Sequence, residues 1–322
     1  MQSASAVAVV VPSWNSAELL PRCLESLRGQ GLEIETMVVD NGSSDGSLAY
    51  LEREGVPHLS LPCNLGFARA VNLGVAETVA EAVLVLNADT AVEPGAVAAL
   101  LAALHDDPGL GGVQPRILQL EEGGSGDAAS ARLYSAGQAL TADGRALESG
   151  AGESQDERWL RGREVFGVCG AACLLRRRLF ADLGGYDESY FAFYEDVDLN
   201  VRARIAGWGF RYVPEAAIWH VGNASWMAGA ARPGAWNARL VARNRIATQA
   251  KFLSARALPR VLAVELASLA HAAGQRRLGA TVRGKLEGLG RLPAALAERR
   301  RLRREGDPEL ARYWLGKGEW VR

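Results

Sequence analysis

Apolar runs that alternate with segments of helical periodicity fill the first hundred residues, and this alternation limits the fold more than any other feature of the chain. Except for the weak run at 58–61, the runs are rich in β-branched residues, as buried parallel strands are. They span residues 7–11, 34–39, 58–61 and 82–86. Leucine, alanine and valine recur at helical spacing between them, and Pro94 begins a further helix that reaches about His105. The pattern predicts an α/β fold, an open and mostly parallel sheet flanked by helices.

A polar cluster follows each of these predicted strands. The clusters are Pro12–Asn15, Asp40–Gly46, Asn64 and Asp89. Because ligands bind at the carboxyl ends of the strands in open α/β sheets, we expect all four clusters to line one rim. Asp40 would accept a hydrogen bond from a pyrimidine ring, or would form an Asx turn within its own loop. Asp89 would bind a divalent cation through oxygen, or would cap the next helix.

Three carboxylates occur within four residues directly after the aromatic-rich stretch Tyr186–Tyr194. They are Glu195, Asp196 and Asp198, and apolar residues recur after them at helical spacing. The pattern predicts an amphipathic helix with all three acids in its first turn, where the helix dipole favours their ionised forms. One of these carboxylates could take a proton from an incoming hydroxyl. Alternatively, Asp198 pairs with Arg202 one turn later.

The second half of the chain is less regular. Residues 121–152 are rich in Gly, Ser, Ala and Asp, and indicate long loops with a hairpin near 133–147. Further strands are predicted at 165–175, 210–213 and 217–221. His220 lies in the last of these, where a buried structural histidine is the alternative to a metal ligand. From Ala235 we expect helices to the end of the chain, with breaks at prolines and glycines.

Charge is distributed unevenly along the chain. Residues 251–322 carry 16 basic and 7 acidic residues, a net of +9, whereas residues 1–250 carry 20 and 30, a net of −10. The basic tail also contains the run Arg299–Arg304 and several leucines, which favour contact with an anionic membrane surface. The alternative is packing on the body or on a second subunit, as in a homo-dimer. We expect no nucleic-acid partner, because Trp314 and Trp320 are too few for a stacking platform.

Several other classes of protein lack support in the sequence. The spacing of Cys23, Cys63, Cys169 and Cys173 fits no zinc pattern. The motifs of dinucleotide-binding folds, phosphate loops and nucleophile elbows do not occur after any predicted strand. We see neither a charged leader region nor an apolar run of the ~18–20 residues that cross a membrane. We therefore expect a cytoplasmic protein, peripheral on the inner face of the plasma membrane if the tail binds lipid.

Seven sequence blocks resemble, in order, those of family 2 glycosyltransferases of the GT-A fold, especially the bacterial rhamnosyltransferase-like members. The blocks are 10–15 (VVPSWN), 38–47 (VVDNGSSDGS), 64–68 (NLGFA), 86–89 (LNAD), 170–175 (GAACLL), 195–199 (EDVDL) and 219–220 (WH). The resemblance implies a GT-A catalytic domain over residues 1–250. Its nucleotide-binding half would be about 1–115, its acceptor half about 116–250, and a basic helical extension would follow at 251–322.

The resemblance also implies roles for single residues. Asp196 would be the general base, supported by Glu195, and Asp89 and His220 would hold Mg²⁺ or Mn²⁺. The residues that bind nucleotide or substrate would be Pro12, Ser13, Asn15, Asp40, Asn41, Asn64, Gly66, Arg69, Asn87, Ala88, Asp198, Arg243 and Asn244. The family's Asp-x-Asp appears here as Asn87-Ala88-Asp89. Because an amide oxygen is a poorer cation ligand than a carboxylate, we expect weaker metal binding.

The implied function is inverting, metal-dependent transfer of a sugar from a nucleoside-diphosphate donor to a hydroxyl of a growing glycan or lipid-linked saccharide. dTDP-rhamnose is the first expected donor, and a UDP-hexose the second. No protein nucleophile is needed, because the cation offsets the charge of the leaving diphosphate and a base activates the hydroxyl. Two alternatives stay open. One is transfer to a polyprenyl phosphate, which needs no base, and the other is a non-catalytic protein that binds nucleotide sugars.

Overall fold

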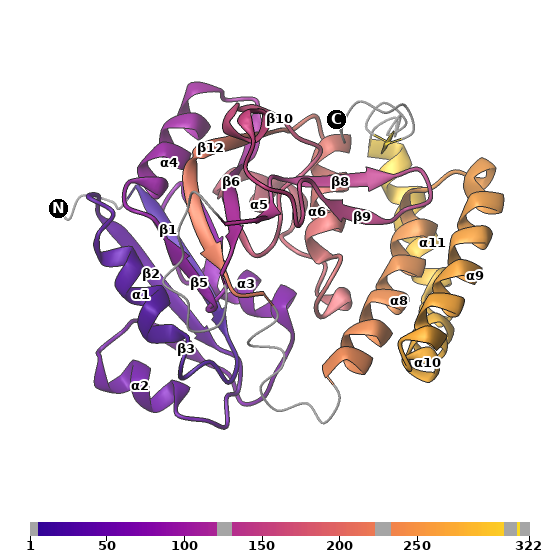
Figure 1. The fold of residues 1–322 in the computed structure, drawn as a ribbon, viewed down its shortest axis with the longest axis horizontal. Helices are drawn as coiled ribbons and strands as arrows, with labels where there is room; N and C mark the ends of the chain where they lie inside the picture. The colour runs from indigo at the N-terminus through magenta and orange to yellow at the C-terminus, as the bar shows by residue number, and fades with distance from the viewer. Residues whose placement is uncertain (1–5, 121–130, 223–232, 306–313, 316–322) are drawn as a thin grey trace.

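A ten-stranded sheet with helices on both faces forms the body of the protein (Figure 1). The computed structural model describes residues 6–120, 131–222, 233–305 and 314–315. The N-terminal half of the sheet consists of parallel strands in the order β4–β1–β2–β3. They are β1 (Val7–Ser13), β2 (Ile34–Asp40), β3 (His58–Ser60) and β4 (Ala82–Leu86). The α/β fold and these four strands are confirmed.

The side chains of β1 alternate between two hydrophobic cores, one on each face of the sheet. Val7, Val9 and Val11 pack with residues of three helices, whereas Val10 packs on the other face with α3 (Phe67–Ala76). The three helices are α1 (Leu20–Arg28), α2 (Ser47–Arg53) and α4 (Ala96–Asp106). Because both faces are covered, Val7–Val11 are fully buried, which explains their continuous apolar run.

The other half of the sheet mixes directions. β11 (Ala172–Arg176) lies antiparallel between β4 and β6 (Leu110–Gln119), and β12 (Gly209–His220) lies parallel to β6. Shorter strands complete it: β5 (Thr90–Val92), β7 (Leu133–Ser135) and β10 (Arg163–Glu164). The prediction of two strands at 210–213 and 217–221 is wrong. They form one strand, whose register shifts between Val213 and Ala217, where Pro214 offers no backbone N–H.

A second, small sheet lies beside the body. The predicted hairpin is confirmed as β8 (Gln138–Thr141) and β9 (Ala146–Glu148), and the 3-10 helix η1 (Glu157–Leu160) follows it. β13 (Trp314–Leu315) pairs with β8 in parallel. Our expectation of helices to the end of the chain is therefore wrong at these two residues.

Helix α6 (Glu195–Ile205) begins with the three acids, as predicted, but it is not amphipathic. Every residue from Val197 to Arg204 is buried. Val197 and Val201, on the apolar side, pack with Leu140 of β8 and with residues of two C-terminal helices. The polar side is covered as well, because Asp198 and Arg202 form a buried ion pair and Arg204 donates to the Phe166 carbonyl. Two short elements precede it, α5 (Arg177–Leu183) and η2 (Glu188–Tyr190).

The C-terminal helices pack on one another beside the β8–β9 hairpin (Figure 1). They are α8 (Pro233–Phe252), η3 (Ala255–Ala257), α9 (Leu258–Gly274), α10 (Leu278–Gly290) and α11 (Leu292–Glu305). A Cβ at Gly284 or Gly288 would collide with backbone of α8, so these glycines permit the close approach of α10. The expected domain boundary at residue 250 falls inside α8. Within the described ranges, no helix is both long and apolar enough to cross a membrane.

Candidate active site

The segment that leads into α6 has an unusual backbone. Phe191, Phe193 and Tyr194 have φ angles of 66°, 66° and 72°, in the left-handed region that bulky side chains avoid. Gly66, at the start of α3, lies so close to this segment that a Cβ there would meet Phe191. Such strain persists only where neighbouring structure enforces it, and it is typical of functional sites.

Asn244 and Arg243 on α8 hold this strained segment. The Nδ2 of Asn244 donates to the carbonyl oxygens of Tyr190, Ala192 and Phe193 at 3.0, 2.8 and 2.7 Å. Arg243 donates to the Tyr190 carbonyl at 2.6 Å, and burial lowers the pKa of its guanidinium to about 10, with nearby arginines adding to the effect. Asn244 is fully buried. Both side chains thus contact protein backbone, where the sequence had suggested phosphate or acceptor.

A cavity of about 200 Å³ opens between the body and the β8–β9 hairpin. Asn87 and His220 line it from the ends of β4 and β12, and Glu195 and Asp196 line it from α6. Tyr134, Gln138, Glu148 and Cys169 complete the polar part of its wall. The fold therefore brings together side chains that lie more than a hundred residues apart in the sequence.

Asp196 is held by three N–H groups. The Oδ2 atom accepts from Gly170 N at 2.9 Å and from Gln138 Nε2 at 2.7 Å, and Oδ1 accepts from Val197 N at 2.8 Å. Burial raises the pKa of Asp196, and these donors oppose that rise by stabilising the charged form. Burial thus makes Asp196 a stronger base than an exposed carboxylate, and the three donors hold it at the cavity wall.

Glu195 differs from its neighbour in this respect. Its Oε2 atom is buried and has no hydrogen-bond partner among the described residues. Burial, and then the charge of Asp196, raise its pKa well above the ordinary range. Asp196 accepts from three other residues, whereas the donor to Glu195 is its own backbone N–H, so we assign the proton of this coupled pair to Glu195.

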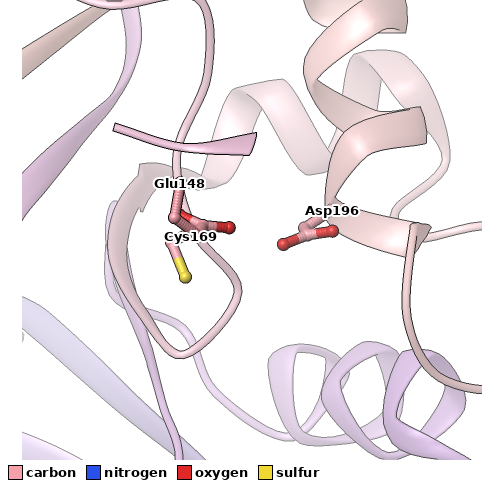
Figure 2. A group of neighbouring side chains, drawn as sticks. All are labelled: Glu148, Cys169 and Asp196. Carbon is pink, nitrogen blue, oxygen red and sulfur yellow. The ribbon is translucent and has the colours of Figure 1, made fainter. Parts of the chain in front are cut away.

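Glu148 and Cys169 lie opposite Asp196 in the cavity, as Figure 2 shows. The Glu148 carboxylate accepts from Ser135 Oγ at 2.5 Å and from Gln138 Nε2 at 3.0 Å. Burial, with the charge of Asp196, raises its pKa to about 7. One ligand atom from each of Glu148, Cys169 and Asp196 lies within 4.8 Å of the others. The sequence analysis missed Glu148, because a lone acid in a Gly-rich region carries no signal.

Asp89 contacts His220, which lines the cavity. Asp89 Oδ1 lies 3.1 Å from His220 Nε2, and the side-chain amide of Asn87 lies 3.5 Å from the same nitrogen. The edge of the Tyr134 ring packs on the imidazole with centroids 4.4 Å apart. Helix α4 has Gly95 at its N-cap, so Asp89 is not the cap of that helix. A carboxylate and an imidazole, both nearly fully buried and adjoining an amide, fit a divalent cation such as Mn²⁺.

Asp40 and Ser13 are register partners at the ends of β2 and β1. The Oδ2 atom of Asp40 accepts from Ser43 N at 3.2 Å, which is the Asx-type contact considered above. Asp40 Oδ1 and Ser13 Oγ are buried and have no hydrogen-bond partner in the described part of the chain. Two unsatisfied polar atoms at the strand ends, beside Pro12, are groups that a polar ligand could satisfy.

The other residues predicted for nucleotide binding hold the loops around these strand ends. Asn15 Oδ1 accepts from Ser44 N at 2.8 Å, and Asn41 Nδ2 donates to Asn64 Oδ1 at 3.1 Å. Arg69 is exposed and lies 3.6 Å from Glu188. Ala88 is buried between Asn87 and Asp89.

Asp198 does not line the cavity. Its carboxylate is fully buried and pairs with Arg202 Nε at 2.7 Å and with Lys251 Nζ at 2.5 Å. The alternative in which Asp198 pairs with Arg202 is therefore confirmed. Its contacts are with protein cations that join α6 to α8.

The sheet topology, the helical layers and the cavity at the strand ends define a protein of the GT-A class. The model of glycosyl transferase family 2 matches residues 8–184, more than half of the chain, and the chain belongs to this family. It is 31% identical over 241 residues to an N-acetylglucosaminyl-diphospho-decaprenol L-rhamnosyltransferase of Mycobacterium tuberculosis, covering 66% of this chain and 75% of that protein.

Two solved structures share the fold. The structure of GalNAc-T7 with UDP, GalNAc and Mn²⁺ aligns with a TM-score of 0.59 at 15% identity. The alignment covers 78% of this chain but only 49% of GalNAc-T7, so the chain spans about half of that protein. The mannosyltransferase PcManGT of Pyrobaculum calidifontis, in complex with GDP-Man and Mn²⁺, aligns with a TM-score of 0.52 at 17% identity, covering 94% of this chain and 86% of that one.

Proposed function

We propose that this glycosyltransferase is inverting and metal-dependent, and that it moves a sugar onto a hydroxyl of a lipid-linked saccharide. The observation that carries the proposal is that Asp196 and His220 line one cavity, with Asp89 in contact with His220. A base and a cation site on one cavity are what such a transfer requires. The donor of first choice is dTDP-rhamnose, which the name of the mycobacterial relative supports, and a UDP-hexose is the second choice.

In the proposed reaction, Asp196 accepts the proton of the acceptor hydroxyl while the hydroxyl oxygen forms a bond to the anomeric carbon. The bond from that carbon to the diphosphate breaks, and the configuration inverts. Gln138 and Gly170 hold Asp196 by hydrogen bonds, and Glu195 keeps its proton and adds no second charge. Asp89 and His220, with Asn87 beside them, would hold a divalent cation that stabilises the charge on the leaving diphosphate.

The donor nucleotide is proposed to bind at the ends of β1 and β2. Asp40 Oδ1 would accept from the N–H of the pyrimidine ring, and Ser13 Oγ would meet a second polar group of the nucleotide. This accounts for two buried polar atoms that have no partner among the residues the structure describes. Asn15, Asn41 and Asn64 support these loops through the hydrogen bonds described above.

The test is a panel of nucleotide sugars, each offered with a short-chain lipid-linked acceptor and with or without Mn²⁺. With dTDP-rhamnose we expect release of the nucleoside diphosphate, and this release should depend on both the acceptor and the cation. The product should have the inverted anomeric configuration. Release only with a polyprenyl phosphate acceptor would favour that alternative. Nucleotide binding without turnover of any donor would show a non-catalytic protein, and a retained configuration would contradict the mechanism.

The C-terminal helices are proposed to contact an anionic membrane surface, where lipid-linked acceptors lie. Helix α9 exposes Leu258, Leu262 and Leu266 by 55%, 55% and 67%, and Ala263 between them is exposed as well. These leucines recur every fourth residue, so they form one apolar ridge along the helix. Such a ridge fits the acyl boundary of a bilayer.

Exposed cations of the C-terminal helices favour a bilayer over a second copy of the chain. The acids of residues 255–302 all form ion pairs; they are Glu265, Glu287 and Glu298. Within the same described stretch, the exposed cations without an ion pair include Arg256, Arg260, Arg276 and Arg300. Each such cation near an anionic leaflet contributes about 1 kcal/mol, whereas two copies of this face would repel each other.

Vesicle flotation tests the membrane proposal. We expect the protein to float with phosphatidylglycerol vesicles at low salt and not with phosphatidylcholine vesicles. A Leu262→Glu, Leu266→Glu double variant should lose flotation, whereas Val79→Glu, at an apolar residue 77% exposed on the body, should keep it. Absence from both kinds of vesicle, with a dimer that the double variant dissociates, would show that the ridge is a subunit interface.

A further inference from the structure

The β8–β9 hairpin places two polar side chains beside Asp196. Gln138 and Glu148 are paired residues of this antiparallel ladder, so their side chains lie on the same face of the hairpin. Both line the cavity. The Nε2 atom of Gln138 donates to Asp196 Oδ2 at 2.7 Å and to Glu148 Oε1 at 3.0 Å. One amide therefore ties two carboxylates together.

A chain of hydrogen bonds sets the orientation of this amide. Asn200, on the second turn of α6, donates from Nδ2 to Gln138 Oε1 at 2.8 Å. Asn200 is itself fixed by both backbone groups of Val168, because it donates to the Val168 carbonyl at 2.8 Å and accepts from the Val168 N–H at 3.2 Å. The oxygen of Gln138 thus faces a donor, and its N–H groups are left for the two carboxylates.

The two carboxylates need such a bridge. Oxygens of Glu148 and Asp196 lie within 4.8 Å of each other in a partly desolvated cavity, where like charges repel strongly. The bridging amide donates to both of them and stabilises their charged forms. It also restricts the rotation of the Asp196 carboxylate, because Gly170 N and Gln138 Nε2 converge on the same oxygen.

We propose that Gln138 is a positioning residue for sugar transfer, which holds Asp196 in place and balances it against Glu148 through one shared amide. The inference rests on the proposed role of Asp196 as the base. It gives the hairpin, for which the sequence offered no interpretation, a defined part in the chemistry. A proton leaves the acceptor hydroxyl for Asp196, and the amide of Gln138 makes no bond to the reacting atoms.

The groups that face Asp196 come from several elements. Glu195 on α6 and Glu148 on β9 are the carboxyl groups, the thiol of Cys169 lies just before β11, and that of Cys173 lies on it. The phenols of Tyr134, Tyr186 and Tyr194 complete the set, and burial raises the pKa of each of them. Thiols and phenols with raised pKa values stay neutral, so Glu148 is the neighbour whose charge Gln138 must balance.

The first variant is Gln138→Met, which keeps the length of the side chain and removes its donors. We expect kcat to fall about 10- to 100-fold, as for the loss of one hydrogen bond to a charged group, with the donor KM within about twofold of wild type. The N–H of Gln138 stabilises ionised Asp196, so its removal should move the acid limb of the kcat/KM profile to higher pH. Leu147→Ala is the control, since Leu147 lies between the hairpin residues on the opposite, 41% exposed face.

For the second variant, Glu148→Gln, we expect the opposite shift of the acid limb. It removes the competing charge and keeps a side chain of the same shape, so the acid limb should move to lower pH. If the role of Gln138 were merely structural, the variants would yield less folded protein, and the acid limb of the kcat/KM profile would stay at the wild-type pH in both. Wild-type kcat and wild-type pH profiles in both variants would overturn the inference. Full activity of Asp196→Asn, measured alongside, would instead overturn the proposed function.

Discussion

Lys251 and Asp198 form a buried ion pair, with Nζ 2.5 Å from Oδ1, that joins α8 to the helix bearing Glu195 and Asp196. The two side chains are 2% and 0% exposed. Lys251 also lies 3.1 Å from Asp187 and 3.1 Å from Glu298 of α11. Burial opposes the charge on Lys251, but these three carboxylates outweigh it and raise the pKa of the ammonium. The C-terminal helices are therefore linked to α6 through charge as well as packing.

We predict that Lys251→Met destabilises the protein by about 3 kcal/mol, because it leaves buried carboxylates with one cation fewer. Urea unfolding measures the loss. Arg283→Ala is the control, since the Arg283–Glu287 pair is largely exposed and should contribute less than about 0.5 kcal/mol. Equal stability of the two variants would show that the Lys251 network does not support α6.

Asn244→Ala is predicted to lower kcat about tenfold or more, because the carbonyls of the strained segment before α6 lose their shared donor. The cavity wall and Asp196 should then become less ordered, while the affinity for free nucleotide stays unchanged. Steady-state kinetics with a nucleotide titration separates the two effects. Gln275→Ala, exposed at the end of α9, should behave as wild type. A variant that loses nucleotide affinity and keeps kcat would place Asn244 in the donor site.

Asn87→Asp is predicted to lower the Mn²⁺ concentration for half-maximal activity several-fold. A carboxylate near His220 Nε2 would replace the amide that lies 3.5 Å away, and carboxylates bind hard cations better than amides do. Asp89→Ala should raise the same concentration. Activity that is indifferent to Mn²⁺ in all three proteins would remove the proposed cation site.

Glu148→Gln is predicted to stabilise the protein at pH 8 and not at pH 4. The folded state raises the pKa of Glu148 from 4.5 to about 7, so it favours the protonated carboxyl. Stability is then lost as pH rises from 4.5 through 7, because ionisation costs more in the folded than in the unfolded chain. The variant escapes this cost, which is on the order of 3 kcal/mol above pH 7. Melting temperatures at both pH values test this; an equal change at both would contradict it.

The parallel strands and the residues at their ends could be predicted because they are local features. The buried run Val7–Val11 predicts a strand of the sheet, and the polar residues directly after it predict the ligand-binding edge. The same holds for Glu195 and Asp196, whose place in the first turn of α6 follows from the spacing after them. These features need no knowledge of distant residues.

The predictions that were wrong or missing depend on contacts between segments that are distant in sequence. Helix α6 looked amphipathic because nothing near it in sequence indicates that its polar side is buried by distant partners such as Lys251 and the Phe166 carbonyl. Glu148 was missed because its importance arises from the register of a short hairpin and from Gln138 reaching Asp196. Asp198 was assigned to the site because it follows Glu195 and Asp196 in sequence, although its carboxylate forms ion pairs within the protein core.

The most direct test of the account is the turnover and nucleotide affinity of Asp196→Asn, with Glu195→Gln beside it. We predict that Asp196→Asn loses transfer by at least about 10²-fold and binds the donor nucleotide as wild type does, because only the base is removed. Glu195→Gln should lose far less, since Glu195 already carries a proton. Wild-type turnover by Asp196→Asn, with the donor, acceptor and Mn²⁺ present, would contradict the assignment of the base and with it the proposed mechanism.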